Sequence, residues 1–266
     1  MTILDKIAQH KVAEVAKNKT KFPISILEKN PFFSKTSISF KAALLDESKL
    51  GIIAEFKKKS PSKGIINASV TVEQTTKGYI EAGASVLSVL TDSEFFGGSN
   101  SDLIKARETN KNSPILRKDF IIDEYQIIEA KSIGADVILL IAAILTPKQI
   151  KEFALFAKKS GLEILLEVHN KEELERSVNE YIDVIGVNNR NLNDFTVDIQ
   201  KSFELVELIP SNFIKISESA LNSAKIIHEL KAVGYKGFLI GETFMKQVQP
   251  EKALAEFIRE VREWKN

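Results

Sequence analysis

The chain repeats one pattern eight times: a short apolar run is followed by a longer stretch with helical spacing. The runs are rich in Val, Ile, Leu and Phe, which is typical of parallel strands covered by helices. They are GIIAEF at 51–56, SVLSVLT at 85–91, PILRKDF at 114–120, DVILLIAA at 136–143, LEILLEV at 162–168, DVIGVN at 183–188, FIKIS at 213–217 and GFLIGE at 237–242. Eight such units in roughly 215 residues favour a closed (β/α)8 TIM barrel. An open, doubly wound sheet is the structural alternative.

Signals for helix ends separate these units. Glycines suited to left-handed caps precede four of the runs, at Gly83, Gly134, Gly161 and Gly234. Thr146-Pro147 places a proline in a first helical turn, and Asn170 with Glu173 resembles a capping box. Together these signals predict that a helix follows each strand and ends shortly before the next.

No linker or low-complexity tract divides the chain, so residues 1–266 are expected to form one domain. Residues 1–50 are expected to add a helical extension that covers one end of the barrel, with LDKIAQHKVAEVA and SFKAALLDE as its helices. The first helix has apolar residues at helical spacing, namely Ile3, Ile7, Ala8, Val12, Val15 and Ala16. We expect it to pack on the body of the protein rather than to act as a targeting helix, which is normally poor in acidic residues.

Composition limits the possible partners and cofactors. Lys and Arg total 37 and Asp and Glu 36, so a net charge of +1 gives no reason to expect nucleic acid or a membrane surface. The absence of cysteine excludes disulfides and thiolate chemistry and fits a cytoplasmic location. His10, His169 and His228 lack metal-ligand spacing, so no metal or other cofactor is expected, and a structural or solvated role is expected for His169.

Polar residues recur where the predicted strands end. They are Glu55 and Lys57 in the first strand region, Lys118 in the third, Glu167 in the fifth, Asn188 and Arg190 in the sixth, and Glu218 in the seventh. In a barrel these ends meet at one mouth, where positioned acids and bases provide general acid–base catalysis. Lys118 lies between Leu116 and Phe120 on one face of its strand. Any one of these charges could instead be a solvated loop residue.

The last two strand regions suggest an anion site. ISESA at 216–220 and IGE at 240–242 each lead from a strand towards a helix, whose first N–H groups bind anions. The loops after the seventh and eighth strands are the usual phosphate site of such barrels. Ser60 and Ser219 could add hydroxyl donors. The alternative is that these turns only cap helices.

Seven segments resemble the indole-3-glycerol-phosphate synthase family in order and spacing. They are IIAEFKKKSPSKG at 52–64, LTDSEFFGGS at 90–99, ILRKDFIID at 115–123, LLEVHN at 165–170, IGVNNRNL at 185–192, ISESA at 216–220 and FLIGETFM at 238–245. The resemblance covers essentially the whole chain, and the first motif is highly specific. It implies a carboxy-lyase of tryptophan biosynthesis. The implied substrate is 1-(2-carboxyphenylamino)-1-deoxyribulose 5-phosphate, and the products are indole-3-glycerol phosphate, carbon dioxide and water.

The resemblance also implies catalytic roles. Lys118 would be the general acid that protonates the ribulose carbonyl as the aromatic carbon attacks it, since an ammonium suits the negative charge that builds on oxygen. Loss of the carboxylate then restores aromaticity. Glu167 and Lys57 would serve the dehydration, and Glu55 and Glu218 would hold the polar network. The assignment of each proton transfer stays open.

The remaining site residues would bind substrate. Asn188 would orient the intermediate, and the guanidinium of Arg190 would engage the anthranilate carboxylate. The aromatic slot would be formed by Phe96, Phe120 and Leu139, for which an ordinary core role is the alternative. The phosphate site would be formed by Ser60, Ser219, Gly241 and Glu242.

Two residues depart from the family pattern. Ala220 stands where the family usually has glycine, which puts the phosphate turn in doubt because alanine restricts the backbone. Glu242 replaces a serine found in some members, and we expect its carboxylate to point away from phosphate.

Two other functions are weighed against the synthase. Phosphoribosylanthranilate isomerase would need a cysteine–aspartate pair, and the chain has no cysteine. The other alternative is a catalytically silent barrel that only binds phosphorylated ligands or a partner. A monomer is expected, with association with another tryptophan-pathway enzyme left open.

Overall fold

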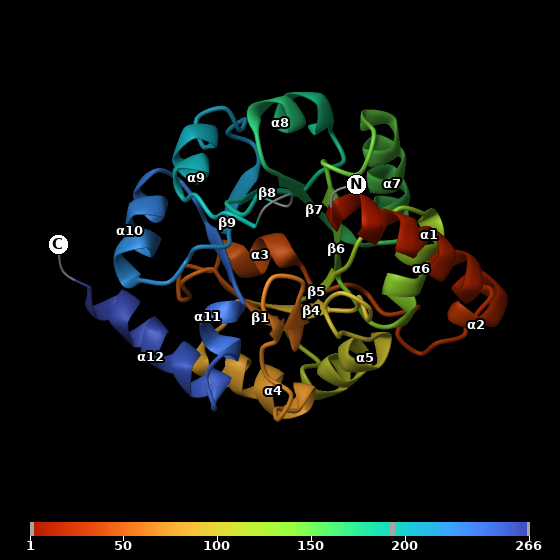
Figure 1. Cartoon of the computed structure of the whole chain (residues 1–266), viewed down its shortest axis with the longest axis horizontal. Coiled ribbons are helices and arrows are strands. Elements are labelled where there is room, and N and C mark those ends of the chain that lie inside the picture. Colours follow the sequence, from red (N-terminus) through yellow and green to blue (C-terminus); the bar gives the residue numbers. More distant parts are fainter. Residues whose placement is uncertain (1–2, 192–194, 265–266) are drawn as a thin grey trace.

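The computed structural model describes residues 3–191 and 195–264. Over this part of the chain, eight parallel strands close into a barrel and helices surround it (Figure 1). Around the barrel the strands are β1 (Ile52–Phe56), β4 (Val86–Leu90), β5 (Ile115–Lys118), β6 (Val137–Ile141), β7 (Glu163–Val168), β8 (Val184–Asn188), β9 (Ile214–Glu218) and β10 (Gly237–Ile240), which pairs with β1. The predicted (β/α)8 barrel is therefore confirmed, and each strand overlaps one of the predicted runs.

Alternation along the strands divides the apolar residues into two clusters. One cluster fills the inside of the barrel and includes Leu116, Leu165 and Ile216, all of them fully buried. The other lies between strands and outer helices and includes Ile138 and Leu140. Successive side chains of a strand point to opposite faces. The charged residue two positions after Leu116, Leu165 and Ile216 therefore faces the inside of the barrel, at the carboxyl end of its strand.

Helices follow the barrel strands, as predicted. They are α4 (Val72–Ala82), α5 (Asn100–Thr109), α6 (Glu124–Ser132), α7 (Pro147–Lys159), α8 (Lys171–Ser177), α9 (Gln200–Leu205), α10 (Ala224–Ala232), α11 (Glu242–Met245) and α12 (Pro250–Glu263). The four predicted glycine caps all have positive φ. Thr146 forms a capping box with Gln149 at the start of α7. Within the described residues, no helix has the length and apolar character needed to cross a bilayer.

Three helices precede the barrel: α1 (Ile3–Lys21), α2 (Ile24–Leu27) and α3 (Phe40–Leu44). The segment at α3 lies at the amino-terminal ends of the strands, where Ser39 Oγ and the Lys41 N–H donate to the Glu163 carboxylate, both at 2.8 Å. Helix α1 reaches the opposite, carboxyl ends, where Lys11 meets Asp92 and Asp119. The N-terminal segment therefore contacts both ends of the barrel.

The buried face of α1 differs from the predicted one. Val12 is 62% exposed, whereas Lys11 is fully buried. The buried positions are Leu4, Ile7, Lys11 and Val15. A lysine can occupy this position in the apolar stripe because Asp92 and Asp119 pair with its ammonium at the barrel mouth. The spacing of apolar residues alone could not reveal these partners.

The loop after β1 contains a hairpin that was not predicted. It consists of β2 (Lys59–Ser60) and β3 (Gly64–Ile65), which pair antiparallel. Lys59 Nζ donates to the Glu94 carbonyl at 2.8 Å, and Lys58 pairs with Asp102. The hairpin is thereby tied to the loop after β4 and places Ser60 at the mouth.

Candidate active site

A cavity at the carboxyl ends of the strands brings together the predicted site residues. Its lining includes Glu55, Lys57, Ser60, Phe96, Lys118, Phe120, Leu139, Glu167, Asn188, Arg190, Glu218, Ser219 and Glu242. The one remaining predicted residue, Gly241, lines an adjoining cavity together with Ser219 and Glu242. Residues predicted from all eight strand regions and their loops thus line these two adjoining cavities.

Lys118 lies at the centre of a three-residue ion-pair network. Its Nζ is 2.8 Å from Glu167 Oε2 and 2.7 Å from Glu218 Oε2, and all three side chains are largely buried. Burial by itself would lower the pKa of Lys118, but the charges of Glu167, Glu218 and Glu55 outweigh it and raise the pKa. A charged ammonium is therefore held in one place inside the barrel.

The two carboxyl groups beside Lys118 have different proton affinities. Burial, reinforced by the negative charges of Glu167 and Glu55, raises the pKa of Glu218 to about 7 even though Lys118 opposes the rise. Burial acts on Glu167 in the same direction, but Lys118 and His169 overcome it and lower the pKa of Glu167. A pair whose environments separate the two pKa values is suited to acid–base work. Glu167 therefore stays ionised at neutral pH, whereas Glu218 changes between its protonated and ionised forms near pH 7.

Two glycines leave room for the carboxylates of neighbouring strands. A Cβ at Gly186 would lie 2.5 Å from Glu218 Oε1, and a Cβ at Gly241 would lie 2.5 Å from Glu55 Oε1. Glu55 in turn pairs with Lys57, whose Nζ is 2.9 Å from Glu55 Oε1. The second ion pair therefore lies directly beside the turn that begins at Gly241.

His169 joins the ionised carboxylate to helix α8. Its Nε2 is 3.4 Å from Glu167 Oε1, and its Nδ1 is 3.1 Å from Glu173 Oε2. The side chain is 9% exposed, so it is not the solvated residue that the sequence left open. Burial opposes the charged form, but the adjacent carboxylates of Glu167 and Glu173 raise the pKa of His169 to about 9. The imidazolium is therefore present at neutral pH and supports the Glu167 charge.

Replacing His169 with Gln should make the stability difference from the wild type depend on pH. A rise in pKa from 6.5 to about 9 corresponds to roughly 3 kcal/mol. Because the folded-state pKa is raised, this stabilisation is complete below pH 6.5 and is lost as pH rises through about 9. Urea unfolding of both proteins at the two ends of this window measures the change. A difference that stays constant across it would show that His169 is neutral in the folded protein.

One wall of the cavity is apolar. The rings of Phe96 and Phe120 lie with their centroids 5.8 Å apart and tilted by 35°. Leu139 is 2% exposed and lines the same cavity. Phe120 follows Lys118 by two residues, so the apolar wall adjoins the ammonium group. This wall offers an aromatic ring a surface beside a proton donor.

The opposite wall consists of the turn after β9. Ser219 and Ala220 both have positive φ, at 69° and 61°. Ser219 Oγ donates to Asn188 Oδ1 at 2.9 Å, and this oxygen also accepts the Arg190 N–H at 3.0 Å. An L-residue in this region is strained by about 1–2 kcal/mol, which glycine avoids. Ala220 therefore adopts the conformation that a glycine would adopt freely, at a cost in backbone strain.

Glu242 does not point away from the site as predicted. It lines both cavities, and its Oε2 lies 3.6 Å from Arg190 NH2. Arg190 also donates to the Phe195 carbonyl at 3.3 Å. The prediction was wrong because it considered only repulsion between carboxylate and phosphate, whereas the guanidinium neutralises the inward-facing carboxylate.

Seven further lining residues were not predicted: Pro61, Ser62, Leu90, Asp119, Ile141, Phe195 and Leu239. Ile141 shares a face of β6 with Leu139, and Leu239 shares a face of β10 with Gly241, so alternation along the strands could have identified both. Phe195 lies in the loop beyond β8, where the sequence has no regular period. Leu192, the last residue of the IGVNNRNL motif, lies outside the described residues.

The fold and the cavity together define a (β/α)8-barrel enzyme in which a buried network of lysine–glutamate ion pairs lies between an apolar wall and the turn after β9. The sequence model of one family, described as indole-3-glycerol phosphate synthase, matches residues 4–257. The chain belongs to the indole-3-glycerol phosphate synthase family.

Relatives of that name have similar length. The Bacteroides thetaiotaomicron protein is 46% identical, with 97% of this chain and 98% of its own covered. A Campylobacter jejuni protein is 42% identical, with 95% of this chain and 98% of its own covered. Among solved structures, 3-hexulose-6-phosphate synthase from Salmonella typhimurium has a TM-score of 0.62 at 10% identity, covering 79% of this chain and 99% of its own. That last likeness shows the fold alone.

Proposed function

We propose that this chain converts 1-(2-carboxyphenylamino)-1-deoxyribulose 5-phosphate into indole-3-glycerol phosphate, carbon dioxide and water. The observation that carries the proposal is the order of groups across the cavity. The cavity is lined first by the apolar wall at Phe96 and Phe120, then by the Lys118 ammonium, and then by the turn at Ser219. The substrate has an aromatic ring, a ketone and a phosphate in the same order.

Ring closure would take place at Lys118. The aromatic carbon that carries the carboxylate attacks the ketone carbon, and the carbonyl oxygen takes a proton from the Lys118 ammonium. A fixed cation at the developing oxyanion stabilises the transition state more than the ground state. The bond between the ring and the carboxylate then breaks, carbon dioxide leaves, and the electron pair of that bond stays with the ring and restores its aromaticity. The carboxylates of Glu167 and Glu218 keep the ammonium aimed at that oxygen.

Dehydration would follow at the second group of residues. The ionised Glu167 removes a proton from the intermediate, and Lys57 protonates the departing hydroxyl, which leaves as water. Glu55 holds Lys57 through its 2.9 Å ion pair, and Glu218 supplies a proton-exchanging group near neutrality. These assignments fit the different proton affinities of the two carboxyl groups.

The two anionic ends of the substrate would be bound separately. Backbone N–H groups at Gly241 and Glu242 and the Ser60 and Ser219 hydroxyls would bind phosphate. Arg190 would bind the anthranilate carboxylate while it keeps its contact with Glu242, and Asn188 would orient the intermediate. The 3.6 Å separation of Arg190 and Glu242 is that of a loose ion pair, and a guanidinium has donors for a second carboxylate.

We propose further that the chain acts as a monomer. All the proposed site residues come from one copy of the chain, so catalysis needs no second one. Association with another enzyme of the tryptophan pathway is compatible with this arrangement. Sedimentation of the purified protein, alone and with such an enzyme, distinguishes the two states.

Purified protein mixed with the proposed substrate should produce indole fluorescence at a rate proportional to enzyme concentration. A substrate analogue with the ketone reduced to an alcohol should inhibit competitively, because it retains both anionic ends and the ring but cannot close. Analogue binding without any turnover of the substrate would instead support a silent phosphate-binding barrel. Absence of both binding and turnover by folded protein would contradict the proposed function.

A further inference from the structure

Lys11 on helix α1 is a fully buried lysine that the proposed chemistry does not use. Its Nζ lies 2.9 Å from Glu14 Oε1, 3.0 Å from Asp92 Oδ2 and 2.9 Å from Asp119 Oδ1. A buried ammonium without partners would be costly. Three carboxylates offset that cost, and two of them belong to the barrel mouth. Lys11 therefore connects the N-terminal helix to the loops that follow β4 and β5.

Both barrel carboxylates fix the backbone of residues in the apolar wall. Asp92 Oδ1 accepts the N–H groups of Phe95 and Phe96, at 2.8 and 3.1 Å. Asp119 Oδ1 accepts the N–H of Phe120 at 2.8 Å. Asp92 thus contacts Lys11 through Oδ2 and the wall through Oδ1, whereas Asp119 uses Oδ1 for both. The aromatic slot is built on these two aspartates.

The two aspartates do not depend on Lys11 equally. Asp119 also accepts hydrogen bonds from Thr91 Oγ1 and Arg117 through its Oδ2, so three elements hold it. Asp92 Oδ2 is paired with Lys11 alone within the part of the chain that the structure describes. Removing the ammonium would therefore loosen the loop at Asp92, which keeps its contact with Lys59 at Glu94, and would leave the neighbourhood of Lys118 in place.

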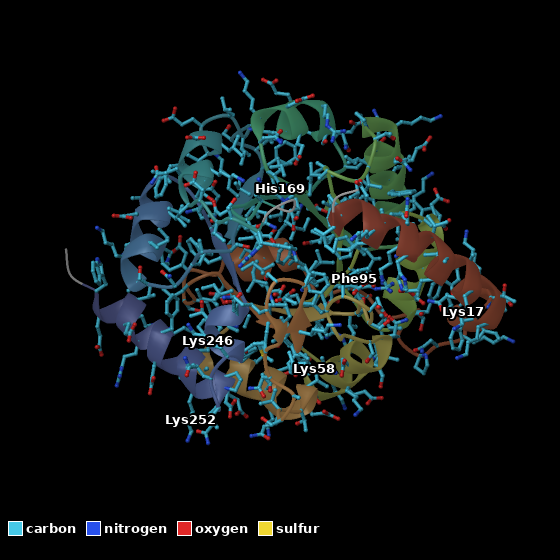
Figure 2. All side chains as sticks on the ribbon, viewed as in Figure 1. Lys17, Lys58, Phe95, His169, Lys246 and Lys252 are labelled. Atoms are coloured by element: carbon cyan, nitrogen blue, oxygen red, sulfur yellow. The ribbon has the colours of Figure 1, made fainter. Side chains whose placement is uncertain are left out.

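A neighbouring contact supports the same connection. The ring of His10 packs edge-on against Phe95, with centroids 5.7 Å apart and an angle of 87°. Figure 2 shows Phe95 beside α1, at the mouth of the barrel. Two consecutive residues of α1 thus hold the same loop, one through a charge and one through a ring.

We propose that Lys11 is a positioning residue for substrate binding, which acts through Asp92 to hold Phe96 in the aromatic slot. The inference rests on the proposed function, since the slot is assigned to the substrate ring. It gives α1 a specific task at the active site, beyond packing on the barrel. Because Lys118 and its carboxylates have their own contacts, Lys11 should affect binding far more than the chemical step.

The test compares Lys11→Met with Lys131→Met. Lys131, on α6, is also buried and also ties the N-terminal segment to the barrel, by donating to the Lys35 carbonyl and Ser37 Oγ. It contacts no residue assigned to the site. Lys11→Met should raise KM roughly tenfold with kcat within about twofold, the pattern expected when uniform binding is lost. Lys131→Met should lower the melting temperature and leave KM unchanged.

A second variant covers the case in which Lys11→Met fails to fold. Asp92→Asn keeps the Oδ1 acceptor for the Phe95 and Phe96 N–H groups but removes the charge that faces Lys11. It should raise KM about threefold, with kcat retained. An unchanged KM in the folded variants, while the wild type turns over, would overturn the role of Lys11 and leave the proposed function standing. Absence of wild-type turnover would overturn both.

Discussion

Replacing Lys118 with Ala should lower kcat at least about a thousandfold, equivalent to about 4 kcal/mol of transition-state stabilisation. The physical reason is that, among the residues that the structure describes, Lys118 is the one cation that pairs with both Glu167 and Glu218 inside the cavity. Lys57, another ammonium in the cavity lining, is paired with Glu55 on a different strand. Steady-state indole fluorescence measures the loss.

Lys58→Ala is the matched control for this change. Lys58 lies at the same end of the barrel and pairs with Asp102, but it does not line either cavity. Its removal should change kcat less than threefold, as expected for a partly exposed ion pair. Turnover that survives in Lys118→Ala would place the acid elsewhere, with Lys57 the first residue to test.

The second large effect is expected for Glu167→Gln, which should lower kcat by about 10²–10³. Glutamine keeps the size of the side chain but cannot accept a proton. It also removes the charge that Lys118 and His169 both face. Binding of the reduced analogue should weaken much less than kcat, because the proposed phosphate site and the apolar wall remain. Parallel titration and turnover experiments separate the two quantities.

Glu173→Gln serves as the control for Glu167→Gln. Glu173 is the other carboxylate on His169, but it belongs to α8 and lies outside both cavities. This variant should retain most of the wild-type turnover. Equal losses in the two variants would mean that Glu167 acts only through the shared histidine and does not take a proton from the intermediate.

The barrel could be predicted because its pattern is local. Each strand is an apolar run, and four helices are followed by a glycine with positive φ such as Gly83 or Gly134, so apolar runs and caps together define the units. The hairpin at Lys59 and Gly64 could not be predicted in this way. It is only two residues long in each strand and depends on contacts with the loop after β4. That the whole chain forms a single domain stays a prediction.

The site residues could be brought together because strands of a barrel end at one mouth. Lys118, Glu167 and Glu218 follow from that rule and from alternation, although their catalytic roles stay predictions. Lys11 could not be assigned, because its partners Asp92 and Asp119 are far away in sequence. The partners of His169 are only two and four residues away, at Glu167 and Glu173, but the contacts form only where β7 leads into α8. The lysine at the buried position between Ile7 and Val15 was the available signal, since a charge on an apolar stripe requires a partner.

The most direct test of the central claim measures carbon dioxide and indole together, in one reaction of wild-type protein with the carboxyphenylamino-deoxyribulose phosphate. The proposed sequence of ring closure, decarboxylation and dehydration predicts one carbon dioxide released for each indole formed, with neither appearing in Lys118→Ala. Carbon dioxide without indole, or neither product from folded protein that binds the reduced analogue, would contradict the claim that this cavity carries out the synthase reaction.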